Sequence, residues 1–271
     1  MVKPADFAAT QVRPARAWRD GRASDASREA PEEAAIGLLY DSAPYVVVMG
    51  TPADVEDLAV GFTVTEGVAA FADIQRVSVS AADEGLLADV LLAPGAGEAL
   101  MGRRRRTLEA RSSCGLCGVE TLKEAMRTVT TVGPGPQIAH AAIQRALATL
   151  ETGQTLGQAT RATHAAAWCA PDGAVTLVRE DVGRHNALDK VVGAALRAGL
   201  DPAAAFIVVT SRCSYEMVEK TAAAGVSILA AISAPTALAI RKAEAAGMTL
   251  IALARADGHM VFAGPERIVE A

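Results

Sequence analysis

The architecture can be inferred from residues 205–254, AFIVVTSRCSYEMVEKTAAAGVSILAAISAPTALAIRKAEAAGMTLIALA. In this stretch three short apolar runs alternate with two helical patterns, and a glycine follows each helix. We expect strands at 205–210, 226–232 and 248–254, and helices at 214–223 and 236–246. Because strands that alternate with helices at this spacing need crossover connections, the pattern predicts a parallel sheet.

The residues before this stretch extend the same pattern. THAAAWCAPDGAVTLVRED, from residue 163, predicts a hairpin closed by Pro171-Asp172-Gly173, and a helix is expected at 186–198. A further helix is expected at 137–150 and another at 119–131, separated by Gly133-Pro134-Gly135-Pro136. We therefore assign residues 136–271 to an α/β domain that binds a cofactor.

The first part of the chain predicts a smaller α+β domain at 35–110. An apolar strand, PYVVVM from Pro44, precedes a helix that begins at an N-cap, Thr51, and runs to about Glu66. Two more strands are expected at 74–80 and 86–92. Residues 1–34 are expected to be a mobile tail, since few of their side chains can be buried, and residues 111–135 a loop and helix that carry two cysteines.

Composition excludes several classes of protein. The 271 residues are 51% hydrophobic and 21% charged, as in an ordinary globular protein, and the net charge is −5. An acidic chain is not a non-specific nucleic-acid binder. No apolar run reaches the length of about 18 residues that a membrane span needs. The first residues lack a signal peptide's apolar region, so we expect a cytoplasmic protein that does not insert in a membrane.

The strongest chemical motif is the thiol pair Cys114 and Cys117 in SSCGLCG, directly before a predicted helix. A helix N-terminus lowers the pKa of a thiol and favours the reactive thiolate. A zinc site needs four ligands, and the rest of the chain has no second close pair of cysteines. We therefore expect Cys114 to be the nucleophile, Cys117 its partner, and no tightly bound metal.

Polar residues cluster where the predicted strands end, and ligands of such sheets bind at the carboxyl ends of the strands. The loops are 179–186, 210–214, 232–236 and 252–257. Helix capping also explains part of this polarity, so both interpretations stay open. The candidate ligand contacts are Arg179, Asp181, Arg184, His185, Asn186, Ser211, Arg212, Ser233 and Thr236.

Three other features are less specific. The basic run Arg103–Arg106 is either a solvated loop or a cradle for phosphate groups. Cys213 is expected to be a small buried filler. His164 precedes an apolar strand and fits either a structural or a ligand role.

These motifs resemble a known family, the formate dehydrogenase accessory sulfurtransferases, or FdhD proteins. The matching pieces are TPADVEDLAVGFTVTEGV, SSCGLCGVE, THAAAWC, VREDVGRHNALDKVVG, SRCSYEMVEKTAAAG and ISAPTALAIRKAEAAGMTLIALAR. Together they run from about residue 38 to the C-terminus. The resemblance implies a cytidine-deaminase-like fold with a mostly parallel sheet and a homodimer.

The resemblance also implies a function. Sulfur would pass from a cysteine desulfurase, as a persulfide on Cys114 or Cys117, to the molybdenum bis(molybdopterin guanine dinucleotide) cofactor before its insertion into formate dehydrogenase. Cofactor contacts would include one continuous stretch after the last strand: Ala252, Leu253, Ala254, Arg255, Ala256 and Asp257. The zinc signature of deaminases is absent, so the fold does not imply deamination. The family's pattern has glycine where Arg161 and Ser211 stand.

Two rival functions remain open. A thiol–disulfide oxidoreductase would place its cysteines directly after a buried strand, whereas RRRRTLEARSS, which precedes Cys114, is polar. A non-catalytic escort would bind the cofactor and formate dehydrogenase without carrying sulfur.

Overall fold

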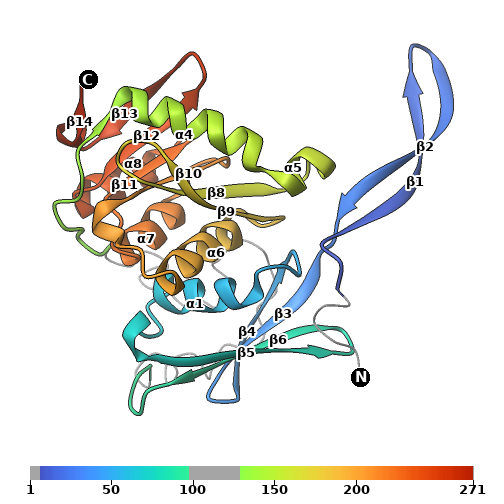
Figure 1. Ribbon diagram of the computed structural model, residues 1–271, viewed down its shortest axis with the longest axis horizontal. Coiled ribbons are helices and arrows are strands. Elements are labelled where there is room, and N and C mark those ends of the chain that lie inside the picture. Colours follow the sequence, from blue (N-terminus) through green and yellow to red (C-terminus); the bar gives the residue numbers. More distant parts are fainter. Residues whose placement is uncertain (1–6, 98–128, 271) are drawn as a thin grey trace.

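The computed structural model describes residues 7–97 and 129–270. Cys114, Cys117, Arg103–Arg106 and nearly all of the predicted helix 119–131 lie outside the described residues. The described chain forms a larger α/β part and a smaller α+β part that pack against each other, with a hairpin that projects from them (Figure 1).

The larger part is built on a six-stranded sheet with the order β13-β12-β11-β10-β8-β9. Its strands are β8 (His164–Cys169), β9 (Val175–Asp181), β10 (Phe206–Val209), β11 (Ile228–Ala231), β12 (Thr249–Arg255) and β13 (Gly258–Ala263). β10, β11 and β12 pair in parallel, as the sequence predicts, whereas β8 pairs antiparallel with both β9 and β10.

The prediction of a mostly parallel sheet is therefore wrong: the sheet is mixed. β9, α6 and β10 do form the predicted succession of strand, helix and co-directional strand, but β8 lies between the two strands. The tight turn at Pro171–Gly173 forces β8 and β9 to be antiparallel neighbours, and β8 then occupies the position beside β10.

Helices cover both faces of this sheet. On one face lie α6 (Arg184–Arg197), α7 (Tyr215–Ala223) and α8 (Ala237–Ala246), whose apolar side chains form one core with the sheet. The other face carries α4 (His140–Gly153), which buries Ile143, Leu147 and Leu150 in a second core. Short elements complete this part: α5 (Thr155–Thr160), β7 (Ile138–Ala139), β14 (Ile268–Val269), and single 3₁₀ turns at Pro202–Ala204 and Pro265–Arg267.

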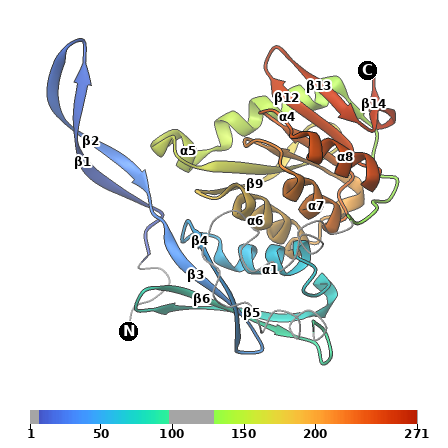
Figure 2. The same ribbon diagram turned by 180° about the vertical axis from the view of Figure 1, so that it is seen from behind.

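The smaller part confirms the α+β prediction. Its four-stranded sheet has the order β4-β3-β6-β5 and packs on one helix, α1, in a third core (Figure 2). The elements are β3 (Ala34–Tyr40), β4 (Ala43–Gly50), α1 (Val55–Thr65), β5 (Ile74–Ala82) and β6 (Gly85–Leu92), with a 3₁₀ turn at Phe71–Asp73. α1 begins later than predicted, since its N-cap is Asp54 and not Thr51.

The two parts meet where α1 crosses α6. A Cβ atom on Gly61 would lie 1.7 Å from the carbonyl oxygen of Asp189, and one on Gly193 would lie 1.9 Å from that of Asp57. The helix backbones therefore touch at a place where only glycine fits, which brings the polar side chains around the crossing into direct contact across the interface.

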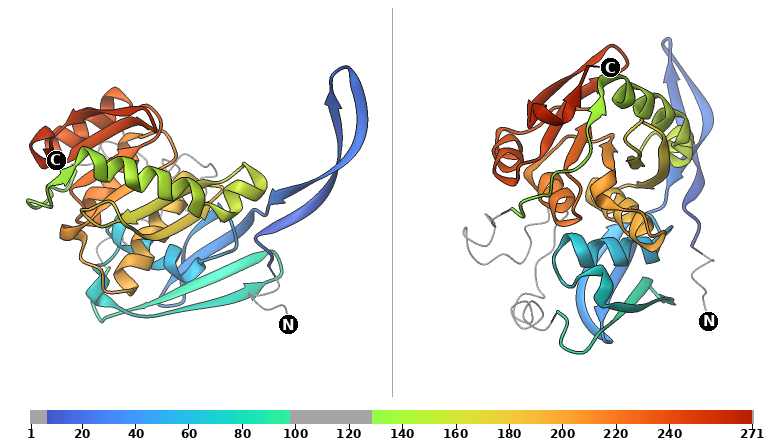
Figure 3. Two further views of the ribbon diagram at one scale, coloured as in Figure 1. Left: turned by 45° about the horizontal axis from the view of Figure 1, so that its top comes forward. Right: turned by 60° about the vertical axis from the view of Figure 1, so that its left-hand side comes forward.

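In place of the predicted mobile tail, residues 10–31 form an antiparallel hairpin of β1 (Thr10–Arg19) and β2 (Arg22–Pro31). The predicted exposure of this segment is confirmed, since almost all of its side chains face solvent. Asp20 and Gly21, both with positive φ, make the two-residue turn at its tip. The hairpin extends well beyond the rest of the chain in the left-hand view of Figure 3.

Candidate functional site

The ends of four strands lie along one edge of the six-stranded sheet. β10, β11 and β12 are parallel, and β9 points the same way because two antiparallel pairings separate it from β10. The predicted loops after these strands therefore meet at a common edge, which we call the strand-end edge. His164 is there as well, because it begins the antiparallel strand β8 opposite Asp181.

The first loop, between β9 and α6, brings cationic side chains to this edge. Arg184 is the first residue of α6, and its Nε atom is buried with no hydrogen-bond partner among the described residues. The Nε2 atom of His185 lies 3.2 Å from Oε2 of Glu216. Burial, together with the charge of Arg184, lowers the pKa of His164, which favours its neutral form.

The second loop, between β10 and α7, is partly closed. Ser211 is buried, and its hydroxyl donates to the carbonyl oxygen of Arg212 at 3.0 Å. Arg212 is exposed. Cys213 is fully buried, as predicted, and forms a parallel bridge with Pro235 of the next loop. Of this loop's candidates, only Arg212 therefore has an exposed side chain.

The loop after β11 and the end of β12 complete the edge. The hydroxyl of Thr236 accepts a hydrogen bond from the Ala239 amide at 3.1 Å. Thr236 therefore caps α8, which was one of the two interpretations that the sequence left open. Leu253 has a φ of 52° at an irregularity of β12, and its amide donates to the Ser233 carbonyl at 3.2 Å. A shallow pocket of about 330 Å³ is lined by Leu253, Arg255, Asp257, Gly258, His259 and Met260.

Two helix N-termini make the strand-end edge suitable for an anion. Neither α6 nor α7 has a side-chain cap, although Thr236 caps α8. Uncapped N–H groups and the helix dipole attract phosphate groups. Arg184 and Arg212 add positive charge beside these two helices.

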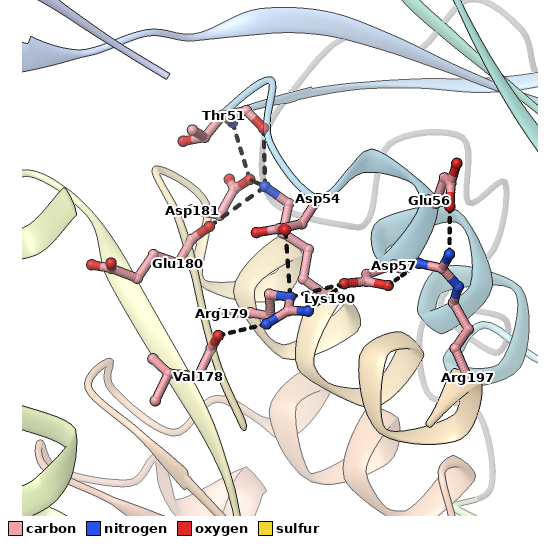
Figure 4. A network of polar contacts seen from close by, with 10 residues as sticks. All are labelled: Thr51, Asp54, Glu56, Asp57, Val178, Arg179, Glu180, Asp181, Lys190 and Arg197. Carbon is pink, nitrogen blue, oxygen red and sulfur yellow. Dashed lines mark hydrogen bonds and ion pairs between the residues drawn. The ribbon is translucent and has the colours of Figure 1, made fainter. Parts of the chain in front are cut away.

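Other residues of the same motif do not face this edge. Figure 4 shows Lys190 and Asp181 in contact at the interface between the two parts of the chain. Both side chains are fully buried, and Lys190 Nζ donates to Asp181 Oδ2 at 2.6 Å and to the Thr51 carbonyl at 2.9 Å. Asp181 also accepts from the amides of Thr51 and Gly183 at 3.0 and 2.7 Å. This ion pair therefore fastens the strand before α1 to the larger part.

Asn186 and Arg179 belong to the same interface. The Nδ2 group of Asn186 donates to Asp181 at 3.0 Å and to the Met49 carbonyl at 2.8 Å, while Gly183, not Asn186, is the N-cap of α6. Arg179 contacts Asp57 of α1 at 2.8 Å (Figure 4).

A second buried ion pair lies farther along the helix crossing. Lys220 Nζ lies 2.8 Å from an Asp189 oxygen and 2.9 Å from Glu66. Burial alone would lower the pKa of Lys220, but these two carboxylates more than reverse the effect and raise it. Thr65 also donates to Asp189, at 2.6 Å.

The structure thus divides the predicted ligand residues into two groups. The prediction is wrong for Asp181, because its carboxylate is fully buried and saturated with hydrogen bonds. Ala252 and Ala254 are fully buried as well and can offer no side-chain contact. Arg179 and Asn186 are bound at the interface. The side chains that are at least partly exposed at the strand-end edge are Arg184, His185, Arg212, Ser233, Thr236, Leu253, Arg255, Ala256 and Asp257.

Sequence reasoning missed the structural partners of this motif. Thr51, Asp57, Lys190 and Lys220 carry the interface, and no local pattern relates residues that lie more than 100 positions apart. The signal that remained visible was the pair Asp189 and Lys190 between the apolar residues in the middle of α6.

The two cysteines among the described residues have unreactive thiols. Burial raises the pKa of both Cys169 and Cys213 to about 12, so their thiols stay protonated at neutral pH. Cys114 and Cys117 lie outside the described residues, and their role stays a prediction.

The described residues contain no group of three or more histidine, cysteine or acidic side chains placed to hold a metal ion. No helix in residues 7–97 or 129–270 has the length and apolar character that crossing a membrane takes.

Comparison with known proteins gives consistent matches. Residues 31–269 match the model of the FdhD/NarQ family. The sulfur carrier protein FdhD of Cupriavidus necator is 45% identical over 252 residues, which cover 93% of this chain and 87% of that protein. The sulfur carrier protein FdhD of Xanthomonas euvesicatoria is 44% identical over 258 residues, which cover 95% and 92%.

One solved structure has a similar fold. The crystal structure of a formate dehydrogenase accessory protein from Desulfotalea psychrophila aligns with a TM-score of 0.76 at 21% identity. The alignment covers 97% of this chain and all of that one. At this identity the likeness establishes the fold alone.

Proposed function

Because this chain belongs to the FdhD/NarQ family, we propose that it is a sulfur carrier that serves formate dehydrogenase. In this proposal it takes a sulfur atom from the persulfide of a cysteine desulfurase. It then passes that sulfur to the molybdenum bis(molybdopterin guanine dinucleotide) cofactor, which is its bound substrate. The observation that carries the proposal is the match over residues 31–269, which includes both the cysteine pair and the strand-end edge.

The proposed chemistry is a thiolate relay. The Cys114 thiolate attacks the outer sulfur of the donor persulfide; a new S–S bond forms and the donor cysteine leaves as a thiolate. Cys117 then attacks Cys114, which closes a disulfide and releases hydrosulfide to the metal centre. A cellular dithiol must reduce that disulfide before the next cycle, since the attack oxidises both cysteines.

The strand-end edge supports the cofactor part of the proposal. The phosphates of a guanine dinucleotide carry negative charge, and the edge presents two uncapped helix N-termini with Arg184 and Arg212. Arg184 has a buried Nε group with no partner among the described residues, which a ligand oxygen would satisfy. We propose that the dinucleotide binds there, over the loops after β9, β10 and β12.

The carrier role is tested by loading the protein with sulfur. The purified chain is incubated with a cysteine desulfurase and cysteine, and its intact mass is measured. We expect a gain of one sulfur atom that Cys114→Ala abolishes. The matched control is Cys169→Ala with Cys213→Ala, which should load normally because these two thiols are protonated and buried.

A different outcome would favour the escort function. If the wild-type chain gains no sulfur yet binds a guanine nucleotide, the protein carries the cofactor without supplying sulfur. If it loads sulfur equally well without Cys114 and Cys117, the relay is wrong.

A further inference from the structure

The hairpin of β1 and β2, residues Thr10–Pro31, is not explained by the proposed function. We call it the arm. All of its residues but Pro31 lie before the stretch, residues 31–269, that matches the family model, and none of them belongs to the strand-end edge. A two-stranded ribbon without an apolar face to bury is only marginally stable in water. Its persistence as a long, exposed projection (Figures 1 and 3) indicates an interaction surface.

The pairing register divides the arm into two different faces. On one face Arg13 lies directly opposite Arg28, and Arg19 lies directly opposite Arg22. We call these four residues the arginine face. The other side chains of that face are small or neutral: Gln11, Ala15, Ala17, Ser24, Ala26 and Ala30. No residue of this face between Thr10 and Pro31 is acidic, although Glu32, just after β2, accepts a hydrogen bond from Gln11 at the base of the face. All four arginines are exposed.

The opposite face carries charges of both signs, one arginine and two acidic residues. There Arg16 lies opposite Asp25, and the Thr10 hydroxyl donates to Glu29 at 2.5 Å. Val12 and Trp18, each about 70% exposed, also belong to this face. The four positive charges of the ribbon's arginine face therefore lie apart from its acidic residues, which are on the opposite face.

The two arginine pairs are costly in the isolated chain. Like charges directly opposite in an antiparallel pair repel, and the described residues give neither pair an acidic partner. Arg28 makes one weak contact, to the Thr160 carbonyl at 3.4 Å. An anionic partner placed between the paired guanidinium groups would remove this repulsion, because each guanidinium can bind a carboxylate through two parallel hydrogen bonds.

We propose that the arginine face docks an acidic segment of a partner protein, with carboxylates at two places about 20 Å apart, since Arg19 lies six positions after Arg13 in the strand. A protein fits better than a nucleic acid because the only aromatic side chain of the ribbon, Trp18, lies on the opposite face, where it cannot stack on bases bound to the arginines.

The test uses the full chain and a fluorescein-labelled oligoglutamate of about 16 residues, long enough to reach both pairs when helical or extended. Its binding is followed by fluorescence anisotropy. The variant Arg22→Glu with Arg28→Glu turns both repulsive pairs into arginine–glutamate pairs, so the hairpin itself is retained while the face becomes neutral. We expect the Kd to rise at least about ten-fold, as for loss of charged hydrogen bonds.

The matched control is Arg76→Glu with Arg241→Glu, which changes the net charge equally at two exposed sites outside the arm. This control should bind like the wild-type chain. The proposal is overturned if both double variants lose binding equally, if the wild-type chain does not bind the peptide, or if a single-stranded oligonucleotide of equal charge binds more tightly. It does not depend on sulfur loading, which is measured separately.

Discussion

Residues 179–190 supply two regions that differ in almost every physical respect. At the interface between the two parts, Asp181 and Lys190 are fully buried, and every charge meets an opposite charge or a hydrogen-bond donor. At the strand-end edge, only a few residues away, Arg184 and His185 are partly exposed, and Arg184 keeps a buried N–H group that no other described residue binds. We call the interface the closed region, because its polar groups are buried and hydrogen-bonded. We call the strand-end edge the open region, because its side chains are partly exposed.

The last three residues of β9 each have a different structural partner. Arg179 contacts Asp57 across the interface, Glu180 accepts hydrogen bonds from the amides of Leu156 and Gly157 at the start of α5, and Asp181 holds Lys190. A polar run at the end of a strand is therefore not one site. The side chains that hold the scaffold also fix the position of those that can meet a ligand.

The largest expected effect comes from breaking the closed region at Lys190. The variant Lys190→Met leaves the Asp181 carboxylate buried without its counter-charge, which typically costs about 3–5 kcal/mol. The free energy of unfolding from urea denaturation should fall by this amount. As a control, Glu266→Gln removes an exposed partner of Arg267 and should cost about 0–1 kcal/mol. Equal losses in the two variants would contradict the comparison.

The next effect concerns the backbone contact beneath this network. Gly61→Ala or Gly193→Ala places a Cβ less than 2 Å from a carbonyl oxygen of the other helix, so α1 and α6 must separate. We expect each substitution to lower the free energy of unfolding by about 1–3 kcal/mol. Gly133→Ala, whose Cβ would meet no atom within 4 Å, is the matched control. A stable Gly193→Ala protein would show that the crossing is not tightly packed.

The open region should respond in the opposite way. Arg184→Gln removes a cation that the scaffold does not use, so the stability should stay within about 0.5 kcal/mol of the wild type. The Kd for guanosine diphosphate should rise about ten-fold, as for loss of a charged hydrogen bond to a ligand. Calorimetric titration measures this Kd, and Arg241→Gln, on the exposed side of α8, is the control. Unchanged affinity would place the nucleotide elsewhere.

The sequence predicted the elements that local periodicity defines. The helices α6, α7 and α8 end just before Gly199, Gly225 and Gly247, as expected, and Thr236 caps α8. The sequence did not predict contacts between residues that lie far apart in the chain. The position of β8 between β9 and β10, and the hydrogen bond from Lys190 to Thr51, join residues that no local pattern connects.

One other miss had a visible signal. Asp20-Gly21 lies between two segments of equal length and is the dipeptide most typical of a two-residue hairpin turn, yet the polar composition favoured a tail. Arg161 stands in the left-handed region with a φ of 56°, at a position where glycine was expected. The expectation of glycine agrees with this conformation, because glycine adopts a positive φ without steric cost. Ser211, by contrast, does not have a positive φ.

The smallest expected effect is a pH dependence at the strand-end edge, where His164 faces Arg184, His185 and Asp181. Burial, the charge of Arg184 and the neighbouring His185 lower the pKa of His164, whereas Asp181 opposes the shift. The folded state therefore binds fewer protons than the unfolded state as the pH falls below the ordinary histidine value of about 6.5, so stability decreases there. In urea denaturation between about pH 5 and 8, His164→Gln should reduce this slope while leaving the difference between the two proteins constant above about pH 7.5, where histidine is neutral in both states. An unchanged slope would mean that the cationic groups of this edge do not act on His164, and that the open region is less positive than its residues indicate.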